Sequence, residues 1–164
     1  MPHHTTGFNG VDRTRPGRVR TVQLSREEAL RLLGSVTLGR IVFTQDALPA
    51  IRPVNHALVA GEIFIRMNRG SALTLQSEAA GADGVVIAYE ADDLDPDTHL
   101  GWSVVVTGYA RLITGAAELA RLRGLVHPWT DRELDLAVRI RPEVVTGMRL
   151  ERGTDETGDQ SGPT

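Results

Sequence analysis

Several stretches of this chain alternate apolar and polar residues or are dense in β-branched and aromatic residues, and turn residues separate them. Such stretches are typical of β-strands. Five or six strands are predicted, at residues 38–44, 51–59, 63–67, 84–90, 102–113 and 138–150. Ala60-Gly61-Glu62 reads as a tight hairpin turn between the second and third strands. Pro53 predicts a sheet edge or a bulge within the second strand, because proline donates no ladder hydrogen bond.

Helical patterns fall between these strands. The first helix begins at Ser25, which forms a capping box with Glu28, and it ends at Gly34. Ser71 is the predicted N-cap of a second short helix. Further helical patterns are predicted at residues 116–125 and 131–137. Strands with short helices at their edges predict an α+β fold, mainly antiparallel, in the form of a small β-barrel.

The length of 164 residues predicts one domain with a proper hydrophobic core. Both ends are rich in polar and turn-forming residues, so a disordered arm at 1–21 and a disordered acidic tail at 151–164 are expected around a domain at 22–150. The arginines are scattered through a background with a net charge of −3, so we expect no nucleic-acid partner. With no long apolar run and no signal peptide, we expect no membrane partner and a cytoplasmic location.

Two missing residue types narrow the chemistry. The chain has no cysteine, which excludes disulfides, thiolate zinc sites and cysteine nucleophiles. All 18 basic residues are arginine, which excludes a Walker lysine, a Schiff-base lysine and a lysine general base. Any phosphate must therefore be held by arginine, by hydroxyl groups or by backbone N–H groups.

No metal site is predicted. The acidic segment 91–97, read as a loop, supplies three aspartates with calcium-loop spacing, but Thr98 and Val104 stand where that pattern requires glycine and glutamate. The five histidines show no metal-ligand spacing. The motifs of serine hydrolases and of Rossmann domains are also missing.

The start of the helix at Ser71 is the best phosphate-binding candidate. A helix N-terminus presents unpaired N–H groups and a partial positive charge, and a phosphate satisfies both. Arg66 lies five residues earlier on the adjoining strand, and Arg69 lies in the turn. These residues could equally be surface arginines beside an ordinary N-cap.

Read in order, four segments resemble the pyridoxamine 5′-phosphate oxidase-like family of flavin-binding split barrels, most closely its small actinobacterial members. The segments are LGRIVFT, ALPAIRPVNHALVAGEIFIRMNRGSAL, VIAYEADDLDPDTHLGWSVVVTGYA, and HPW followed by the final strand. Together they span about residues 22–150. The resemblance implies a split β-barrel with short flanking helices and a homodimer, with one FMN at each of two sites on the subunit interface.

The resemblance also implies the residues that hold this cofactor. Expected along the isoalloxazine ring are Arg52, Pro53, Val54 and Asn55. Expected beside the ribityl chain and phosphate are Arg66, Met67, Asn68 and Ser71. Trp102 and Ser103 match a strand that approaches the flavin, from the partner subunit.

This chain departs from the family pattern at two positions. Ala72 stands where a basic residue is common, and Met67 stands where a threonine is common. Losing both contacts weakens binding by about 2–4 kcal/mol if nothing replaces them. Arg69 is the residue expected to compensate, because its guanidinium reaches a similar place.

Three functions stay open at this stage. The first is an FMN-dependent oxidoreductase that transfers hydride through the flavin to a small-molecule substrate, with His56 as the candidate for proton transfer. The second is a reductase on the same barrel that uses the deazaflavin F420. The third is a non-catalytic module that holds flavin or haem, with His56 or His127 as the axial haem ligand. Oxidation of pyridoxamine phosphate itself is not expected, because no second basic cluster for that phosphate is visible.

Overall fold

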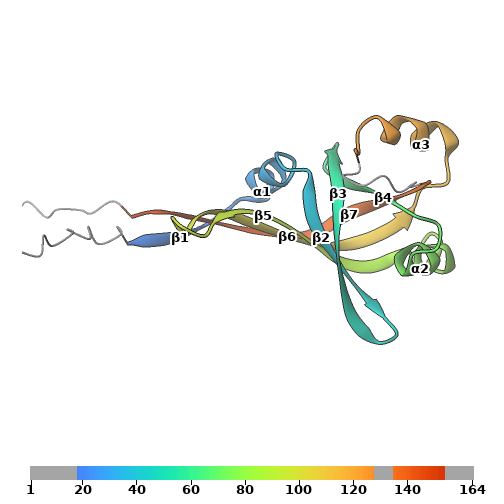
Figure 1. The fold of residues 1–164 in the computed structure, drawn as a ribbon, viewed down its shortest axis with the longest axis horizontal. Helices are drawn as coiled ribbons and strands as arrows, with labels where there is room; N and C mark the ends of the chain where they lie inside the picture. Colours follow the sequence, from blue (N-terminus) through green and yellow to red (C-terminus); the bar gives the residue numbers. More distant parts are fainter. Residues whose placement is uncertain (1–17, 128–134, 154–164) are drawn as a thin grey trace, which may run out of the picture.

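The computed structural model describes residues 18–127 and 135–153. Within these ranges three short helices flank seven strands (Figure 1). The helices are α1 (Arg26–Leu33), α2 (Ala72–Ala80) and α3 (Ala116–Arg123). The strands are β1 (Val19–Gln23), β2 (Leu38–Gln45), β3 (Leu48–Val59), β4 (Glu62–Met67), β5 (Val85–Asp95), β6 (Leu100–Leu112) and β7 (Leu136–Arg152). None of these helices is long and apolar enough to cross a membrane.

The strands form one antiparallel sheet that closes on itself. Its order is β1-β7-β4-β3-β2-β5-β6, and β7 also pairs with β6, so six strands make a ring and β1 is added outside it. The joint between β2 and β5 is the shortest in this ring, with Arg40–Val42 opposite Ala88–Glu90. The predicted fold class, mainly antiparallel α+β, is confirmed.

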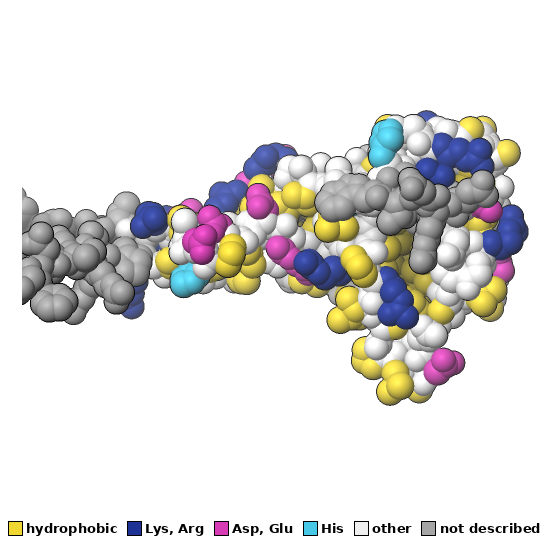
Figure 2. All heavy atoms as spheres, viewed as in Figure 1, with side chains coloured by type: hydrophobic (Ala, Val, Ile, Leu, Met, Phe, Trp, Pro, Cys, Tyr) yellow, Lys and Arg dark blue, Asp and Glu magenta, His cyan; other side chains and the backbone are white. Residues whose placement is uncertain are grey.

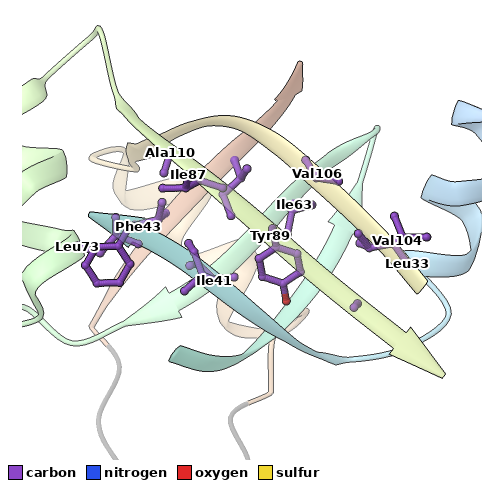
Figure 3. Close-up of a cluster of buried hydrophobic side chains, with 14 of the residues drawn as sticks. Leu33, Ile41, Phe43, Ile63, Leu73, Ile87, Tyr89, Val104, Val106 and Ala110 are labelled. Carbon is purple, nitrogen blue, oxygen red and sulfur yellow. The ribbon is translucent and has the colours of Figure 1, made fainter. Parts of the chain in front are cut away.

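The core fills the ring because inward positions alternate along each strand. On β6, Val104, Val106 and Ala110 are buried, whereas Val105 and Tyr109 between them are exposed. Figure 3 shows these inward side chains meeting residues of α1, β2, β4, α2 and β5. A smaller cluster lies under α3 and covers the other face of β4.

Two tight turns set the register of β3. At Asp46 and Ala47 both φ angles are positive, as they are at Ala60 and Gly61, and two-residue turns of this kind match the twist of the strands they join. The first turn makes β2 and β3 a hairpin that projects from the ring (Figure 1). The second returns the chain along β4.

Several predicted boundaries need correction. The sequence predicts five or six strands and a disordered arm to residue 21, but residues 19–21 pair with the end of β7, which itself extends into the predicted tail as far as Arg152. The loop predicted at 91–97 is also wrong over most of its length, because β5 continues to Asp95 opposite β6. Main-chain pairing outweighs the acidic composition there.

The helical pattern predicted at 131–137 is wrong at its end. Leu136 and Ala137 begin β7 and pair with β4, whereas residues 131–134 lie outside the described part of the chain. Residues 1–17 and 154–164 lie outside it as well.

Candidate functional site

A cleft of about 570 Å³ lies where β3 and β4 separate. The two strands pair only over His56–Val59 and Glu62–Ile65. Beyond His56, β3 continues beside β2 into the hairpin, while β4 continues beside β7. The cleft opens in this fork, with Arg52–Asn55 on one side and Arg66–Asn68 on the other.

The start of α2 closes the end of the cleft. Ser71 is the N-cap of this helix, and its Oγ accepts a hydrogen bond of 3.2 Å from the Thr74 N–H. Thr74 is fully buried, and its hydroxyl donates to the Asn68 carbonyl at 3.0 Å. Because that hydroxyl has one proton, the 2.7 Å contact between the two hydroxyl groups has Ser71 as its donor. These hydrogen bonds of Thr74 therefore hold in place the turn that lines the cleft.

The lining suits an anionic, partly apolar ligand. It contains the side chains of Arg52 and Arg66, and no described lining residue is a carboxylate. Its apolar part comes from Phe43, Pro53, Val54, Met67, Ala72 and Val126. The first N–H groups of α2 add a partial positive charge at the same end as Ser71.

Eight of the residues predicted to hold a cofactor meet in this one cleft. They are Arg52, Pro53, Val54, Asn55, Arg66, Met67, Asn68 and Ser71. Arg69 lies in the same turn and is exposed, but it does not line the cleft. Trp102 and Ser103 lie on β6 opposite Asp93 and Asp92, and neither reaches the cleft of its own chain.

His56 does not face the cleft, so its predicted role in proton transfer has no support from the geometry. The ring is buried, and Nε2 lies 2.9 Å from the Leu33 carbonyl, which can only accept, so Nε2 carries the proton. Nδ1 then accepts from the Tyr89 hydroxyl at 2.7 Å. Burial lowers the pKa of His56 below its ordinary value and raises the pKa of Tyr89. Both groups are neutral parts of the core.

Five lining residues were not among the predicted contacts: Phe43, Gln45, Gly70, Ala72 and Val126. Phe43 is an inward position of a strand that the sequence does predict, and Gly70 and Ala72 flank Ser71. Nothing in the sequence around Val126 indicates that this residue lines a cleft. It follows α3, about sixty residues after β4, and only the packing of α3 on the outer face of β4 brings it here.

No group of three potential metal ligands occurs within residues 18–127 and 135–153. Of the three aspartates with calcium-loop spacing, Asp95 caps the turn at the end of β5. Asp95 Oδ1 accepts hydrogen bonds from the N–H groups of Asp97 and Thr98, at 2.8 and 3.2 Å, and these bonds lower the pKa of its carboxyl group. The arrangement is that of an ordinary turn cap.

Comparisons with known proteins relate the chain to a family and a fold. A family model described as pyridoxamine 5′-phosphate oxidase matches residues 25–149. The uncharacterized protein Rv0080 of Mycobacterium tuberculosis is 48% identical over 142 residues, which cover 86% of this chain and 93% of that protein.

Two solved structures share both the fold and part of the sequence. A FAD-binding protein of Mycobacterium smegmatis is 30% identical, with a TM-score of 0.58 over 80% of this chain and all of that one. A Corynebacterium glutamicum protein, provisionally described as a pyridoxamine 5′-phosphate oxidase, is also 30% identical, with a TM-score of 0.66 over 81% of this chain and 95% of that one. The predicted split-barrel fold is thereby confirmed.

Proposed function

The chain belongs to the pyridoxamine 5′-phosphate oxidase family, and from this premise we propose that it binds FMN in the cleft between β3 and β4 and acts as a flavin-dependent oxidoreductase. The observation that carries the proposal is the meeting of Arg66, Ser71 and the N-terminus of α2 at one end of the cleft, with the polar edge of β3 along its side. An anionic group and a planar polar ring need these two features together.

The donor set fits a flavin phosphate. Two arginines offer charge-assisted hydrogen bonds, and the start of α2 offers backbone N–H groups. Arg69, the residue expected to compensate for Ala72, lies outside the lining of the cleft. Arg52, on the opposite wall, supplies the second positive charge instead.

The remaining walls fit the ring system. Phe43, Met67 and Val126 are buried at the base of the lining, and together with Pro53 and Val54 they give the cleft an apolar side. A bound flavin supplies hydride transfer at its N5 atom, so the protein needs to supply only position and electrostatics.

We also propose that the protein works as a homodimer. Trp102 and Ser103 do not reach the cleft of their own chain, so a contact between their strand and the flavin requires a second copy. The proposed substrate is a small molecule.

Purification without added cofactor, followed by an absorption spectrum, tests the proposal. We expect the bands of oxidised flavin, or saturable binding at micromolar concentration when FMN is titrated. Parallel titrations with FAD, F420 and haem separate the other cofactors, and FAD is included because of the binding described for the M. smegmatis protein. A protein that binds haem or F420 and no flavin would contradict the proposal.

Activity is tested next, on the flavin-loaded protein. Reduction by a nicotinamide donor, followed by reoxidation with a small-molecule acceptor, would be measured at the flavin absorption band. Turnover supports an oxidoreductase. A flavin that stays oxidised with every donor, or that cannot pass its electrons on, indicates a storage or signalling module.

A further inference from the structure

The strand β2 has two edges, and each of its residues turns its backbone groups toward one of them. In an antiparallel pair, residues alternate between facing the partner strand and facing away from it. The N–H of His56 donates to the carbonyl of Thr37, which immediately precedes β2, at 2.9 Å. Odd-numbered residues of β2 therefore face β3, and even-numbered residues face the opposite edge, where Arg40–Val42 pair with β5.

Beyond Val42 the pairing with β5 ends, and a side chain of α2 takes the next position on this edge. Thr44 is the next residue that faces the edge, and its carbonyl accepts a hydrogen bond of 2.8 Å from Nε2 of Gln76. Among the described residues, this is the one hydrogen bond between α2 and the β2–β3 hairpin. Thr44 is exposed, so water would satisfy its carbonyl as well. What the amide of Gln76 adds is a tie between the two elements.

This tie joins two walls of the cleft. The residues on either side of Thr44 belong to the lining, and so do Ser71 and Ala72 at the start of α2. Gln76 itself does not line the cleft and lies about one helical turn after Ala72. The hydrogen bond therefore spans the end of the cleft at which a phosphate is expected.

The buried side of the same two elements shows which part of the hairpin depends on this tie. Phe43 and Leu73 belong to one buried cluster, so the base of the hairpin is fixed against α2 from inside the ring (Figure 3). The part beyond this anchor begins at Thr44 and includes Gln45, which lines the cleft. Gln76 holds that part from the exposed side.

We propose that Gln76 is a positioning residue: its amide ties the hairpin to α2, sets the width of the cleft between Gln45 and the start of α2, and slows the escape of a bound ligand. The inference goes beyond the proposed function, because the tie exists in the protein without ligand. It rests on the proposed function only for the identity of the ligand, FMN.

Two spin labels measure the tie in the ligand-free protein. The chain has no cysteine, so labels attach only at Leu48→Cys on the hairpin and Glu78→Cys on α2, both exposed positions. Pulsed electron paramagnetic resonance should give a narrow distribution of distances between the labels, and Gln76→Ala should broaden it. The helix itself is kept, because alanine is the best helix former. Identical distributions would overturn the inference.

Three further variants of the labelled protein separate the hydrogen bond from the size of the side chain. Gln76→Lys keeps a donor of similar reach and should keep the distribution narrow. Gln76→Glu has the same size but no donor at pH 7.5, so it should broaden the distribution as alanine does. Leu75→Ala, the matched control at an exposed neighbour, should change nothing. A narrow distribution with glutamate, or equal broadening by Leu75→Ala, would overturn the inference.

The release of FMN tests the consequence for the ligand. In stopped-flow fluorescence, Gln76→Ala should release FMN at least threefold faster than the wild type, with an association rate within twofold, because a neutral hydrogen bond that holds the cleft closed is lost. An unchanged release rate would overturn the role in ligand escape and leave the proposed function standing. Failure of the wild type to bind FMN would overturn the proposed function and the escape role together, while the distances between the labels still decide whether the tie exists.

Discussion

Among single residues, Arg66 and Ser71 carry the proposed phosphate contact, and their effect is separable from that of the ring. Arg66→Ala with Ser71→Ala should lower FMN affinity at least tenfold, because the charge-assisted hydrogen bond of Arg66 is lost together with the neutral one that the Ser71 hydroxyl makes when it turns from Thr74 to the phosphate, together worth about 2–4 kcal/mol. Riboflavin lacks the phosphate, so its affinity should change less than threefold. Fluorescence titration of both ligands measures the ratio.

Arg69→Ala is the control for this pair. It removes an arginine from the same turn, but one that does not line the cleft, so FMN affinity should stay within twofold of the wild type. If Arg69→Ala weakens FMN binding as much as the double variant does, the phosphate lies outside the cleft. If the double variant weakens riboflavin equally, the two side chains hold the fold rather than the phosphate.

His56 shows how burial converts a candidate catalytic residue into a source of pH-dependent stability. Its folded pKa lies below the unfolded value of about 6.5, so the unfolded chain binds the extra proton first. The stabilisation is present above that pH and is lost as the pH falls below it. Urea unfolding should show a free energy of unfolding that decreases between pH 7.5 and pH 5.

His56→Gln should remove that part of the pH dependence. The amide can still donate to the Leu33 carbonyl, but it fits the Tyr89 hydroxyl less well, and we expect a loss of about 1–3 kcal/mol at pH 7.5. An unchanged slope between pH 7.5 and 5 in this variant would show that the other histidines and carboxyl groups dominate.

At the level of elements, one charged side chain, that of Arg40, supports the short pairing between β2 and β5. Arg40 Nη1 lies 2.9 Å from both Glu90 Oε2 and Asp92 Oδ2. Burial and the neighbouring Asp92 raise the pKa of Glu90, and Arg40 opposes that shift. The guanidinium between the two carboxylates therefore offsets their mutual repulsion.

Arg40→Gln should consequently destabilise the ring in a pH-dependent way. Because the cluster is half exposed, the loss at pH 7.5 should be about 1 kcal/mol. It should shrink as the pH falls from 7.5 to 5, since the raised pKa of Glu90 lets this carboxyl group take up a proton earlier than an ordinary glutamate, and protonation weakens the repulsion. Thermal unfolding of variant and wild type at the two pH values measures the difference, and a loss that grows toward pH 5 would contradict this account.

Element by element, local patterns predicted the hairpin, both capped helices and the strands on each side of the cleft. They predicted these well because turn geometry, capping and inward alternation are all local, as the turn at Ala60 and the cap at Ser71 show. Long-range pairing explains the failures. The acidic end of β5 is a strand only because β6 lies beside it, and Val126 lines the cleft only because α3 packs on β4.

For the molecule as a whole, the outer face of the ring is more apolar than an isolated domain requires. Val86 on β5, Val105 and Tyr109 on β6, and Val144 on β7 lie on adjacent strands and are 38–61% exposed. Figure 2 shows further hydrophobic side chains on the projecting β2–β3 hairpin. A cluster of exposed apolar side chains of this kind is typical of a protein–protein interface.

The direction of the side chains on β6 links this face to the cofactor. Ser103 shares the outward parity of Val105 and Tyr109, so a partner docked on this face would meet Ser103. Trp102 has the opposite parity and is buried in the core of its own chain. Of the two residues expected to reach a partner's flavin, only Ser103 points outward, and Trp102 is better placed to support the strand from inside.

The apolar outer face can therefore be tested together with cofactor binding. We expect the wild type to sediment as a dimer, and Val105→Glu with Val144→Glu to give a monomer, because like charges would be brought together in a face that must lose water. If the flavin lies at the interface, FMN affinity should fall at least tenfold in this monomer.

Leu75→Glu, at an exposed leucine on α2, is the control and should leave both properties unchanged. A monomer that binds FMN as tightly as the wild type would place the whole cofactor site within one chain. A dimer that survives both glutamate substitutions would place the interface on another face, such as the β2–β3 hairpin.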